Sequence, residues 1–526
     1  MIYFQPGTQY DDTMQILKAF DIANGEWMGT YNSTTLVKGA GFPLLAALLH
    51  SLGIPLIQGC HLLYCFGAFL FAYAIEPIQK NRLLWFAAYL FVLFNPIGFS
   101  AQLTRYYRDI VYYALAFLAL SAMLGMLLRP KHRLPCLLGG LFLASCVLTR
   151  EDAHWLWIYC IACFLVSLLF AKKEFTKLSI WLRHILRQIL LLVAGFACVA
   201  LPVAALNASY YGAFVLDEYS VGPYAQAYGA LSRLDGGLQD SRTTIPEEQR
   251  LLLYEKSPHF ASLYPYLDAE GAIFETWKEI HGEYRTGYFS FVLRDSAYRH
   301  YNFENAEAAA DYFSELAKQV NSYADTVDGA GPKRSGISAR FYVKDIPSIL
   351  RQTMTGLWKT VRYENISCIP LQTDADDSYL KIFEDFTKSP CAANRLMDDG
   401  SVEENYHLTG FNRWMQRGMR VLTLIYQTIS PALFIAAMLW FFTETVLCFR
   451  TRTFSPGWIA SASLFCVLFL RAAMIGFVDA TTFSAIVTPS YQAGTFVALG
   501  MFQAFQLLRF FLFILQKTKK VKPLSQ

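Results

Sequence analysis

Residues 111–128 read VYYALAFLALSAMLGMLL, and this stretch decides the class of fold. It holds no charged side chain, and Arg108-Asp109 and Arg129 bound it on its two sides. A helix of this length spans about 27 Å at a rise of about 1.5 Å per residue, close to the hydrocarbon thickness of a bilayer. The stretch therefore predicts a membrane-spanning helix.

The same apolar character recurs along the chain. Hydrophobic residues make up 54% of the 526 positions and charged residues only 16%, a balance that favours a membrane protein over a water-soluble domain. Nine segments are long and apolar enough to predict membrane-spanning helices: 55–75, 83–99, 111–128, 134–149, 153–171, 189–206, 420–445, 458–478 and 493–515. The sequence therefore predicts an all-α polytopic membrane protein with about nine transmembrane helices.

Charge is distributed unevenly between the loops. Residues 207–412 hold 30 Asp and Glu against 19 Lys and Arg, so the remaining chain is strongly basic. Most of its basic residues lie in short loops on one predicted side of the membrane: Lys80, Arg82, Arg129, Lys131, Arg133, Lys172, Lys173, Lys177, Arg183, Arg187, Arg450, Arg452, Lys517, Lys519, Lys520 and Lys522. The alternate short loops hold only Arg105, Arg108 and Arg150. Because cytoplasmic loops are enriched in Lys and Arg, the first group is expected in the cytoplasm and the second group outside.

Four regions follow from this topology. Residues 1–54 form a first external loop with amphipathic helices, 55–206 a bundle of six spans, 207–415 a soluble, mostly helical extracytoplasmic domain, and 416–526 three further spans with a basic cytoplasmic tail. Nine spans and a cytoplasmic C-terminus place residue 1 outside. Because residues 1–54 contain no signal peptide, this parity predicts one more upstream span or an unusual start.

Asp11 and Asp12 are adjacent carboxylates in the first external loop. They stand at the start of a helix expected to run to about Asn24 and to end at Gly25. Four apolar residues fall on one face of it at helical spacing, which predicts a helix on the membrane surface: Met14, Leu17, Phe20 and Ala23. A partly dry site can raise the pKa of one carboxyl toward neutrality while a nearby cation keeps the other ionised, which suits general-base catalysis. The alternative is that the pair only caps the helix, and the two roles are compatible.

Lys38, Arg105, Arg108 and Arg150 are external basic residues close to the predicted membrane surface. They could converge to bind a lipid-linked phosphate, because the guanidinium group presents a planar fork matched to phosphate oxygens. The alternative is ordinary anchoring at the membrane interface, where such residues are common.

Arg471 is an arginine expected deep inside a span. It lies 13 residues after Trp458, which places it roughly 20 Å from the cytoplasmic end of that helix. A charge at such a depth costs about 2.5 to 3.5 kcal/mol on insertion scales and usually faces a cavity or a partner. Asp479 and a bound phosphate are the two candidate partners.

Several nearby polar residues are secondary candidates: Asp109, Glu151, Asp152, His154 and Tyr491. Asp109 could pair with an arginine of its own loop, and Glu151 and Asp152 with Arg150. Alternatively Asp11 and Asp109 could hold Mg or Mn, since hard carboxylate ligands suit these metals; no cofactor is certain. Separately, Cys368 and Cys391 lie away from the spans and could form a disulfide in an oxidising compartment.

Short motifs in the first external loop resemble one family of membrane enzymes. The motifs are Tyr10-Asp11-Asp12, Ala23-Asn24-Gly25-Glu26-Trp27, Lys38-Gly39-Ala40-Gly41-Phe42-Pro43 and Leu52-Gly53-Ile54-Pro55. Together they resemble the corresponding loop of the C-type (GT-C fold) membrane glycosyltransferases, and most closely the protein mannosyltransferases and the bacterial aminoarabinose-transferase-like enzymes. The resemblance covers the membrane half of the chain, and it covers residues 207–415 poorly.

By position, the resemblance implies that Asp11 is the catalytic base, with Asp12 beside it and Lys38 as a phosphate contact. It also implies that the loop from Arg105 through Asp109 is the second functional loop. Arg471 and the stretch Pro489-Ser490-Tyr491 are similar in place to the segments that close the donor site in the family. One departure is that the family has a span directly before this loop, whereas only ten residues precede Asp11 here.

The predicted activity is inverting transfer of a hexose or pentose from a polyprenyl-phosphate donor to an extracytoplasmic glycan, lipid or protein acceptor. The alternatives are a polysaccharide polymerase or ligase that uses a diphosphate-linked donor, and a transporter or flippase without enzymatic activity. Membrane lipids are expected partners and nucleic acids are not. A bacterial inner membrane is preferred over the endoplasmic reticulum as the location.

Overall fold

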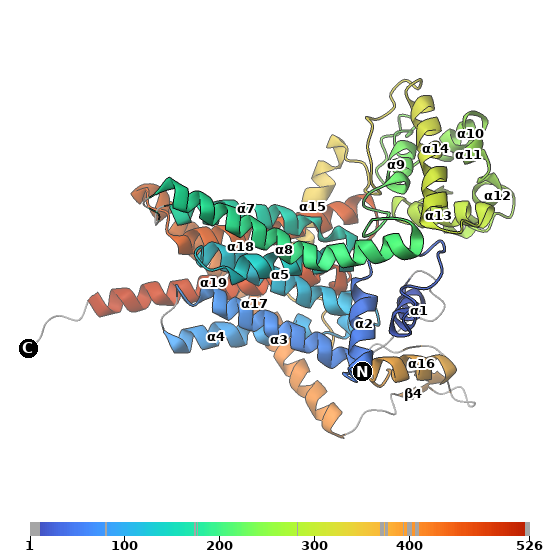
Figure 1. Cartoon of the computed structure of the whole chain (residues 1–526). Coiled ribbons are helices and arrows are strands. Elements are labelled where there is room, and N and C mark those ends of the chain that lie inside the picture. Colours follow the sequence, from blue (N-terminus) through green and yellow to red (C-terminus); the bar gives the residue numbers. More distant parts are fainter. Residues whose placement is uncertain are drawn as a thin grey trace, which may run out of the picture.

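The computed structural model describes residues 11–78, 81–172, 175, 177–280, 282–368, 373, 377–392, 394–396, 402–404 and 410–520. Long helices run side by side in a bundle (Figure 1). Their bounds are α3 (Leu56–Ile75), α4 (Arg82–Leu93), α5 (Asp109–Leu128), α6 (Leu134–Thr149), α7 (Trp155–Lys172), α8 (Leu178–Tyr211), α17 (Gly410–Thr451), α18 (Pro456–Thr481) and α19 (Pro489–Lys520). At one end α19 extends beyond the bundle, and at the other end stand α1 (Asp12–Ala23), α2 (Gly41–Ser51) and a group of outer helices.

In the described part of the chain seven helices are long and apolar enough to cross a membrane, so the class expected from the sequence, an all-α polytopic membrane protein, is confirmed. The predicted count of nine transmembrane helices is not confirmed. α4 and α6 occupy two of the predicted positions, but they are shorter apolar helices of 12 and 16 residues. α4 ends early because Asn95 and Pro96 open a short 3-10 helix, η1 (Pro96–Phe99), inside the predicted segment 83–99.

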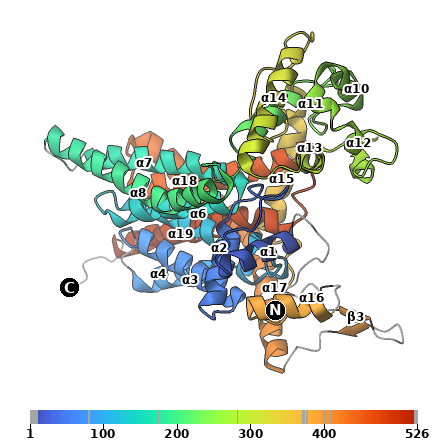
Figure 2. The same cartoon turned by 45° about the vertical axis from the view of Figure 1, so that its right-hand side comes forward.

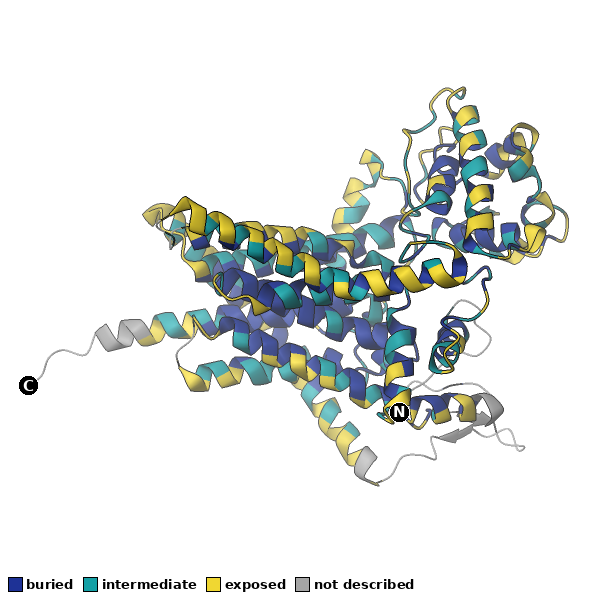
Figure 3. Cartoon of the chain, viewed as in Figure 1, coloured by how far each residue is buried: buried dark blue, intermediate teal, exposed yellow. Residues whose placement is uncertain are grey.

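α5 forms the centre of the bundle. Every residue of this helix except Leu115 is buried, whereas neighbouring helices carry exposed residues on their outer faces (Figure 3). Leu165 and Leu169 on α7 and Leu190 on α8 are more than half exposed. Helices that are apolar on their outer as well as their inner faces are suited to a lipid environment, where outward apolar groups are not penalised.

The outer helices form a compact unit with its own apolar core. They are α9 (Pro223–Leu231), α10 (Glu247–Lys256), α11 (Pro258–Ala261), α12 (Tyr264–Leu267), α13 (Thr286–Tyr301) and α14 (Ala306–Ala324), with a two-stranded ribbon of β1 (Lys278–Ile280) and β2 (Glu283–Tyr284). Tyr228, Phe289 and Phe313 lie in this core, which also takes in Trp27 and Leu36 of the first external loop. The loop and the outer helices therefore share one core.

The region predicted as one domain, 207–415, is divided among three cores. α15 (Ile346–Val361) packs on α18 and α19, and its Leu357 and Val361 belong to the core of the bundle. α16 (Asp377–Thr387) packs on α2 through Phe383 and Phe386. A short ribbon of β3 (Asn394–Leu396) and β4 (Val402–Glu404) follows α16 in the chain.

The disulfide considered between Cys368 and Cys391 is not formed, because the two cysteines pack against different helices. The Cys368 thiol lies 3.0 Å from the Thr423 hydroxyl of α17. The Cys391 thiol is buried beside α16, 3.9 Å from the Leu380 carbonyl oxygen.

Candidate functional site

Six segments bring charged side chains together at the end of the bundle that carries the outer helices. Charged side chains come from the start of α1, the loop before α2, the loop before α5 with the first residue of α5, the segment from Arg150 through the 3-10 helix η3 (Glu151–His154) before α7, and the second half of α18, while the start of α19 adds the Tyr491 carbonyl oxygen. The ion-paired residues are Asp11, Asp12, Lys38, Arg105, Arg108, Asp109, Arg150, Glu151, Asp152 and Arg471, and we call this set the charge network. All ten were candidates from the sequence.

Asp11 and Asp12 bind different cations at the start of α1. Asp11 accepts a hydrogen bond of 2.6 Å from Lys38 Nζ. Asp12 is fully buried and accepts from both Nε and Nη2 of Arg105, at 2.9 and 2.5 Å. Asp11 stands at the N-cap position of α1, but its side chain makes no capping hydrogen bond. The interpretation of the pair as a simple helix cap is therefore wrong, because the cations hold the Asp11 carboxylate.

The side chain of Tyr107 connects three of the cations. Its hydroxyl accepts a hydrogen bond of 2.7 Å from Lys38 Nζ. The Lys38, Arg105 and Arg108 head groups lie 4.9, 5.2 and 5.2 Å from the centre of its ring, within the range of cation–π attraction. One aromatic side chain thus keeps three like charges close together, which the sequence analysis did not anticipate.

The next ion pairs of the charge network lie where α5 and α7 begin. Arg108 pairs with Glu151, and Arg150 pairs with Asp109 and, at 2.7 Å, with Asp152. Asp109 was expected to pair with Arg105 or Arg108, but its partner is Arg150 instead. Neighbouring positions in one loop therefore bind different partners.

Arg471 is completely buried, as its place inside a span suggested, but Asp479 is not its partner. Its Nη1 lies 3.1 Å from Asp152 Oδ2, and its Nη2 donates to the Tyr491 carbonyl oxygen at 3.0 Å. Asp479 accepts hydrogen bonds from the backbone amides of Ala485 and Ile486 and so closes the loop after α18. Asp479 does not pair with Arg471 because its carboxylate accepts hydrogen bonds from the backbone amides of the tight loop after α18.

Tyr491 and His154 are not members of the charge network. The ring of Tyr491 lies 5.4 Å from the Arg150 guanidinium, so it borders the charge network. His154 is exposed at the end of η3, and among the described residues no ion pair is found for it. Its charge acts on the buried Asp217, whose pKa burial raises to about 6 although His154 acts to lower it.

The five cations of the charge network are balanced by five carboxylates, and three of these carboxylates are more accessible than any of the cations. The side chains of Asp11, Glu151 and Asp152 are 35%, 25% and 23% exposed, whereas Lys38 and Arg471 are almost wholly buried. Burial acts to raise the pKa of Asp11, but Lys38, Arg105 and Arg108 together lower it below its usual value. Asp11 is therefore ionised at neutral pH, whereas the sequence suggested that one pKa of the pair would be raised.

The metal interpretation does not fit the contacts found. Within the described part of the chain, no three His, Cys, Asp or Glu side chains come together as metal ligands. Asp11 and Asp109, the two proposed ligands, instead bind Lys38 and Arg150. Their oxygens are occupied by cations of the protein.

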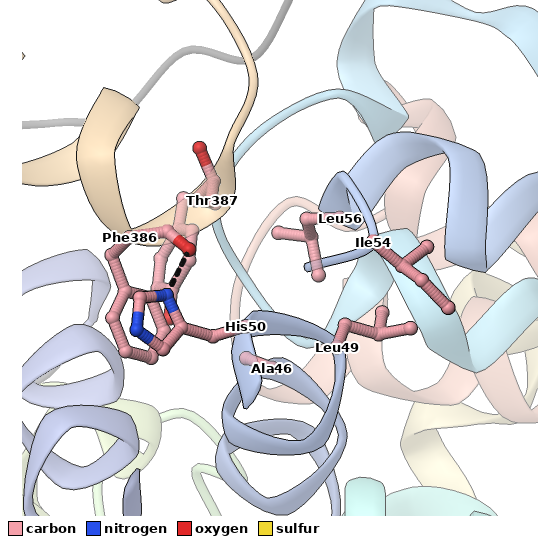
Figure 4. A pocket seen from close by; sticks show the side chains of 8 residues that line it. Ala46, Leu49, His50, Ile54, Leu56, Phe386 and Thr387 are labelled. Atoms are coloured by element: carbon pink, nitrogen blue, oxygen red, sulfur yellow. Dashed lines mark hydrogen bonds between the residues drawn. The ribbon is translucent and has the colours of Figure 1, made fainter. Parts of the chain in front are cut away.

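A small pocket lies beside the charge network and not within it (Figure 4). It lies between α2 and α16 and is lined mainly by apolar groups. His50 stacks on Phe386 with ring centres 4.4 Å apart, and the His50 ring nitrogen Nδ1 lies 2.8 Å from the Phe386 carbonyl oxygen. These contacts fasten α16 to α2.

Arg294 on α13 is a positioning residue that the sequence analysis missed. It donates to the backbone carbonyls of Ser33 and Thr35 at 2.8 and 2.9 Å and pairs with Glu218 at 2.5 Å. It thereby fastens the segment just before Lys38 to the outer helices. No local signal could have found the contacts with Ser33 and Thr35, because these residues lie about 260 positions from Arg294 in the chain.

Lys18 is a second missed residue, on the inner side of α1. It is buried and donates to the Thr34 carbonyl oxygen at 2.8 Å. Burial, with Lys38 and Arg294 nearby, lowers the pKa of Lys18 to about 7. Because the predicted apolar face of α1 did not include this position, a buried amine was not expected there.

The architecture and the site together define an all-α polytopic membrane protein with a buried charge network at one end of its bundle. Comparison with protein-family models, with curated proteins and with solved structures finds no match for this chain.

Proposed function

We propose that this chain is a membrane glycosyltransferase that moves a sugar from a polyprenyl-phosphate donor to an extracytoplasmic acceptor. The observation that carries the proposal is the position of Asp11, an ionised and partly exposed carboxylate in contact with Lys38 and Arg105. The transfer needs a carboxylate that accepts a proton and cations that stabilise a departing phosphate. Both kinds of group occur in the charge network.

In the proposed reaction the acceptor hydroxyl oxygen attacks the anomeric carbon of the donor sugar. The bond from that carbon to the phosphate oxygen breaks, the polyprenyl phosphate leaves, and Asp11 takes the hydroxyl proton. This single displacement inverts the anomeric configuration. Asp12 acts through Arg105, which it holds by two hydrogen bonds, and so keeps that guanidinium close to Asp11.

The charge balance of the network limits how the donor phosphate can bind. Each cation already has a carboxylate partner, so the phosphate has to take the place of a carboxylate at Lys38, Arg105 or Arg108. A phosphate bound to Lys38 would weaken the hold of that amine on Asp11. Since Lys38 lowers the pKa of Asp11, the carboxylate would become a stronger base when the donor is in place.

The outer helices and the membrane would provide the surroundings for the two substrates. The outer helices share a core with the loop that carries Lys38, which supports a role for them in positioning the acceptor. Both substrates are expected on the extracytoplasmic side, and we place the protein in a bacterial inner membrane.

A transfer assay tests the proposal. Purified protein in liposomes is given polyprenyl-phosphate [14C]mannose, glucose or arabinose, together with native membranes as the acceptor source, and label leaving the lipid fraction is measured. The Asp11→Asn variant is expected to lose at least about a hundredfold in rate, the usual contribution of a general base. The matched control is Asp21→Asn in the last turn of the same helix, which should retain activity.

Three outcomes would count against the proposal. Equal rates for wild type, Asp11→Asn and Asp12→Asn would remove the aspartates from the mechanism. Transfer from diphosphate-linked donors alone would favour a polymerase or ligase. Retention of anomeric configuration in the product would exclude a single displacement.

A further inference from the structure

α15 carries an apolar stripe that no described part of the chain covers. Ile346, Leu350, Met354 and Trp358 recur every four residues and all four side chains are exposed, Leu350 by 60% and Met354 by 57%. Positions four apart lie on one face of a helix. A continuous apolar face of this kind on the surface of a protein marks an interaction site.

The opposite face of α15 is fixed to the bundle. Gly356 lies against Ile486 in the loop after α18, and the Thr360 hydroxyl bonds to the Gln492 side chain of α19. The N-terminal end of the helix projects from the side of the bundle in Figure 1, and in Figure 2 the helix overlaps the outer helices. α15 is therefore held rigidly along one face while its apolar stripe points away from the protein.

The depth of α15 can be read from its contact with α17. The segment 421–443 of α17 holds no charged residue and spans about 35 Å at 1.5 Å per residue, enough to cross the hydrocarbon core. Its outer end is marked by Arg420. Just after α15, the Tyr363 carbonyl oxygen accepts a hydrogen bond of 3.1 Å from Gln427, which lies about 10 Å inward from Arg420.

The charges around the stripe match a lipid surface. α15 contains Arg351 and Lys359 and no acidic residue between Ile346 and Val361. Arg351, and Arg362 just after the helix, are exposed. Asp345 and Glu364 lie beyond its two ends, and Glu364 lies 3.8 Å from Lys359 and 4.0 Å from the exposed Arg362. Basic side chains beside an apolar face with a tryptophan are typical of helices that lie in the membrane interface.

We propose that α15 lies in the outer leaflet of the bilayer, with its apolar stripe among the acyl chains and with Arg351 and Arg362 bound to anionic phospholipid head groups. This surface is independent of the proposed transferase activity. It also ties the lipid surface to the charge network, because Gln492, which binds α15, is adjacent to Tyr491.

Photocrosslinking tests the proposal on the full chain in nanodiscs that contain phosphatidylcholine and radiolabelled phosphatidylglycerol. The photoreactive residue p-benzoylphenylalanine replaces Leu350 or Met354 in turn. Leu165, an exposed apolar residue of the spanning helix α7, is the positive control, and Lys318, exposed on the outer helix α14, is the negative control. We expect labelled lipid on positions 350 and 354 at a yield comparable to that at 165 and well above that at 318.

Three results of these crosslinking experiments would contradict the proposal or part of it. Yields at both α15 positions as low as at 318 would overturn the proposal, and a crosslinked dimer band in place of lipid would assign the stripe to a second copy of the chain. The double variant Arg351→Gln and Arg362→Gln should lower the yield of phosphatidylglycerol adduct at position 354. An unchanged yield would remove the head-group contacts from the proposal.

Discussion

Arg471 of α18 and Asp152 of η3, which are 319 positions apart, form an ion pair of 3.1 Å in which the arginine side chain is completely buried. The pair is asymmetric. Asp152 also binds Arg150, whereas Asp152 is the only carboxylate found to pair with Arg471 among the described residues. Removal of Arg471 therefore leaves Asp152 with Arg150, whereas removal of Asp152 leaves Arg471 without this carboxylate.

The asymmetry predicts that Asp152→Asn is more destabilising than Arg471→Gln. The first change leaves a buried guanidinium without a carboxylate, and breaking a buried pair in this way costs about 3 to 5 kcal/mol. The second change leaves Asp152 with Arg150, so the loss is smaller. Thermal unfolding in detergent measures both, and the double variant should recover stability toward that of Arg471→Gln. Equal losses in the two single variants would contradict the prediction.

Lys18 predicts a pH-dependent effect on stability. Its pKa is lowered to about 7 in the folded protein, whereas an unfolded chain keeps this proton up to about pH 10. Between these values the unfolded state binds more protons, so the contribution of Lys18 to stability rises with pH. The difference in Tm between Lys18→Met and wild type should therefore fall from pH 6 to pH 9. For Lys318→Met, at an exposed position, the difference should stay constant.

Asp217 predicts a dependence of opposite sign. Burial raises the pKa of Asp217 to about 6, above its value of about 4 in an unfolded chain. The folded state then binds more protons between these values, so stability falls as pH rises through them. Asp217→Asn keeps an acceptor for the Ser220 amide and should raise Tm at pH 7.5 by more than at pH 5. The exposed Glu270 provides a control, since Glu270→Gln should show no such trend.

Two glycines set the distance between α6 and α8. A Cβ atom on Gly140 would lie 2.0 Å from the Leu192 carbonyl oxygen, and one on Gly195 would lie 2.1 Å from that of Leu137. Small residues allow such close approach of membrane helices. Gly195→Ala should therefore destabilise the protein by about 1 to 3 kcal/mol, as overpacking does.

The matched control for this change is Gly418→Ala in α17, where a Cβ atom meets open space. Helix propensity alone then acts, and the alanine should leave Tm unchanged or raise it slightly. Equal effects at positions 195 and 418 in thermal unfolding would show that helix contact is not the cause.

The sequence by itself determined the class of fold, because long uncharged runs such as 111–128 can be accommodated only in a membrane or a core, and α5 is indeed buried along its length. It also determined the extent of α1, since Asn24 and Gly25 end that helix by local chemistry. The buried face of α1 was not determined by the sequence: Leu17 is exposed and Lys18 is buried, because α1 packs against α2 and Lys18 binds the Thr34 carbonyl oxygen of the following loop.

The predicted pair of Arg150 with Asp152, two positions apart, is found, but Glu151 binds Arg108 instead of Arg150. The tertiary structure decided how the other charges are paired. Each candidate residue could be found from its type and its place at a helix end, but the partners of Asp109, Arg108 and Arg471 come from other elements. Ion pairing depends on distances of a few ångströms between segments far apart in the chain, and no local pattern encodes such distances. The same holds for Arg294, whose contacts with the first external loop join α13 to a segment about 260 positions away.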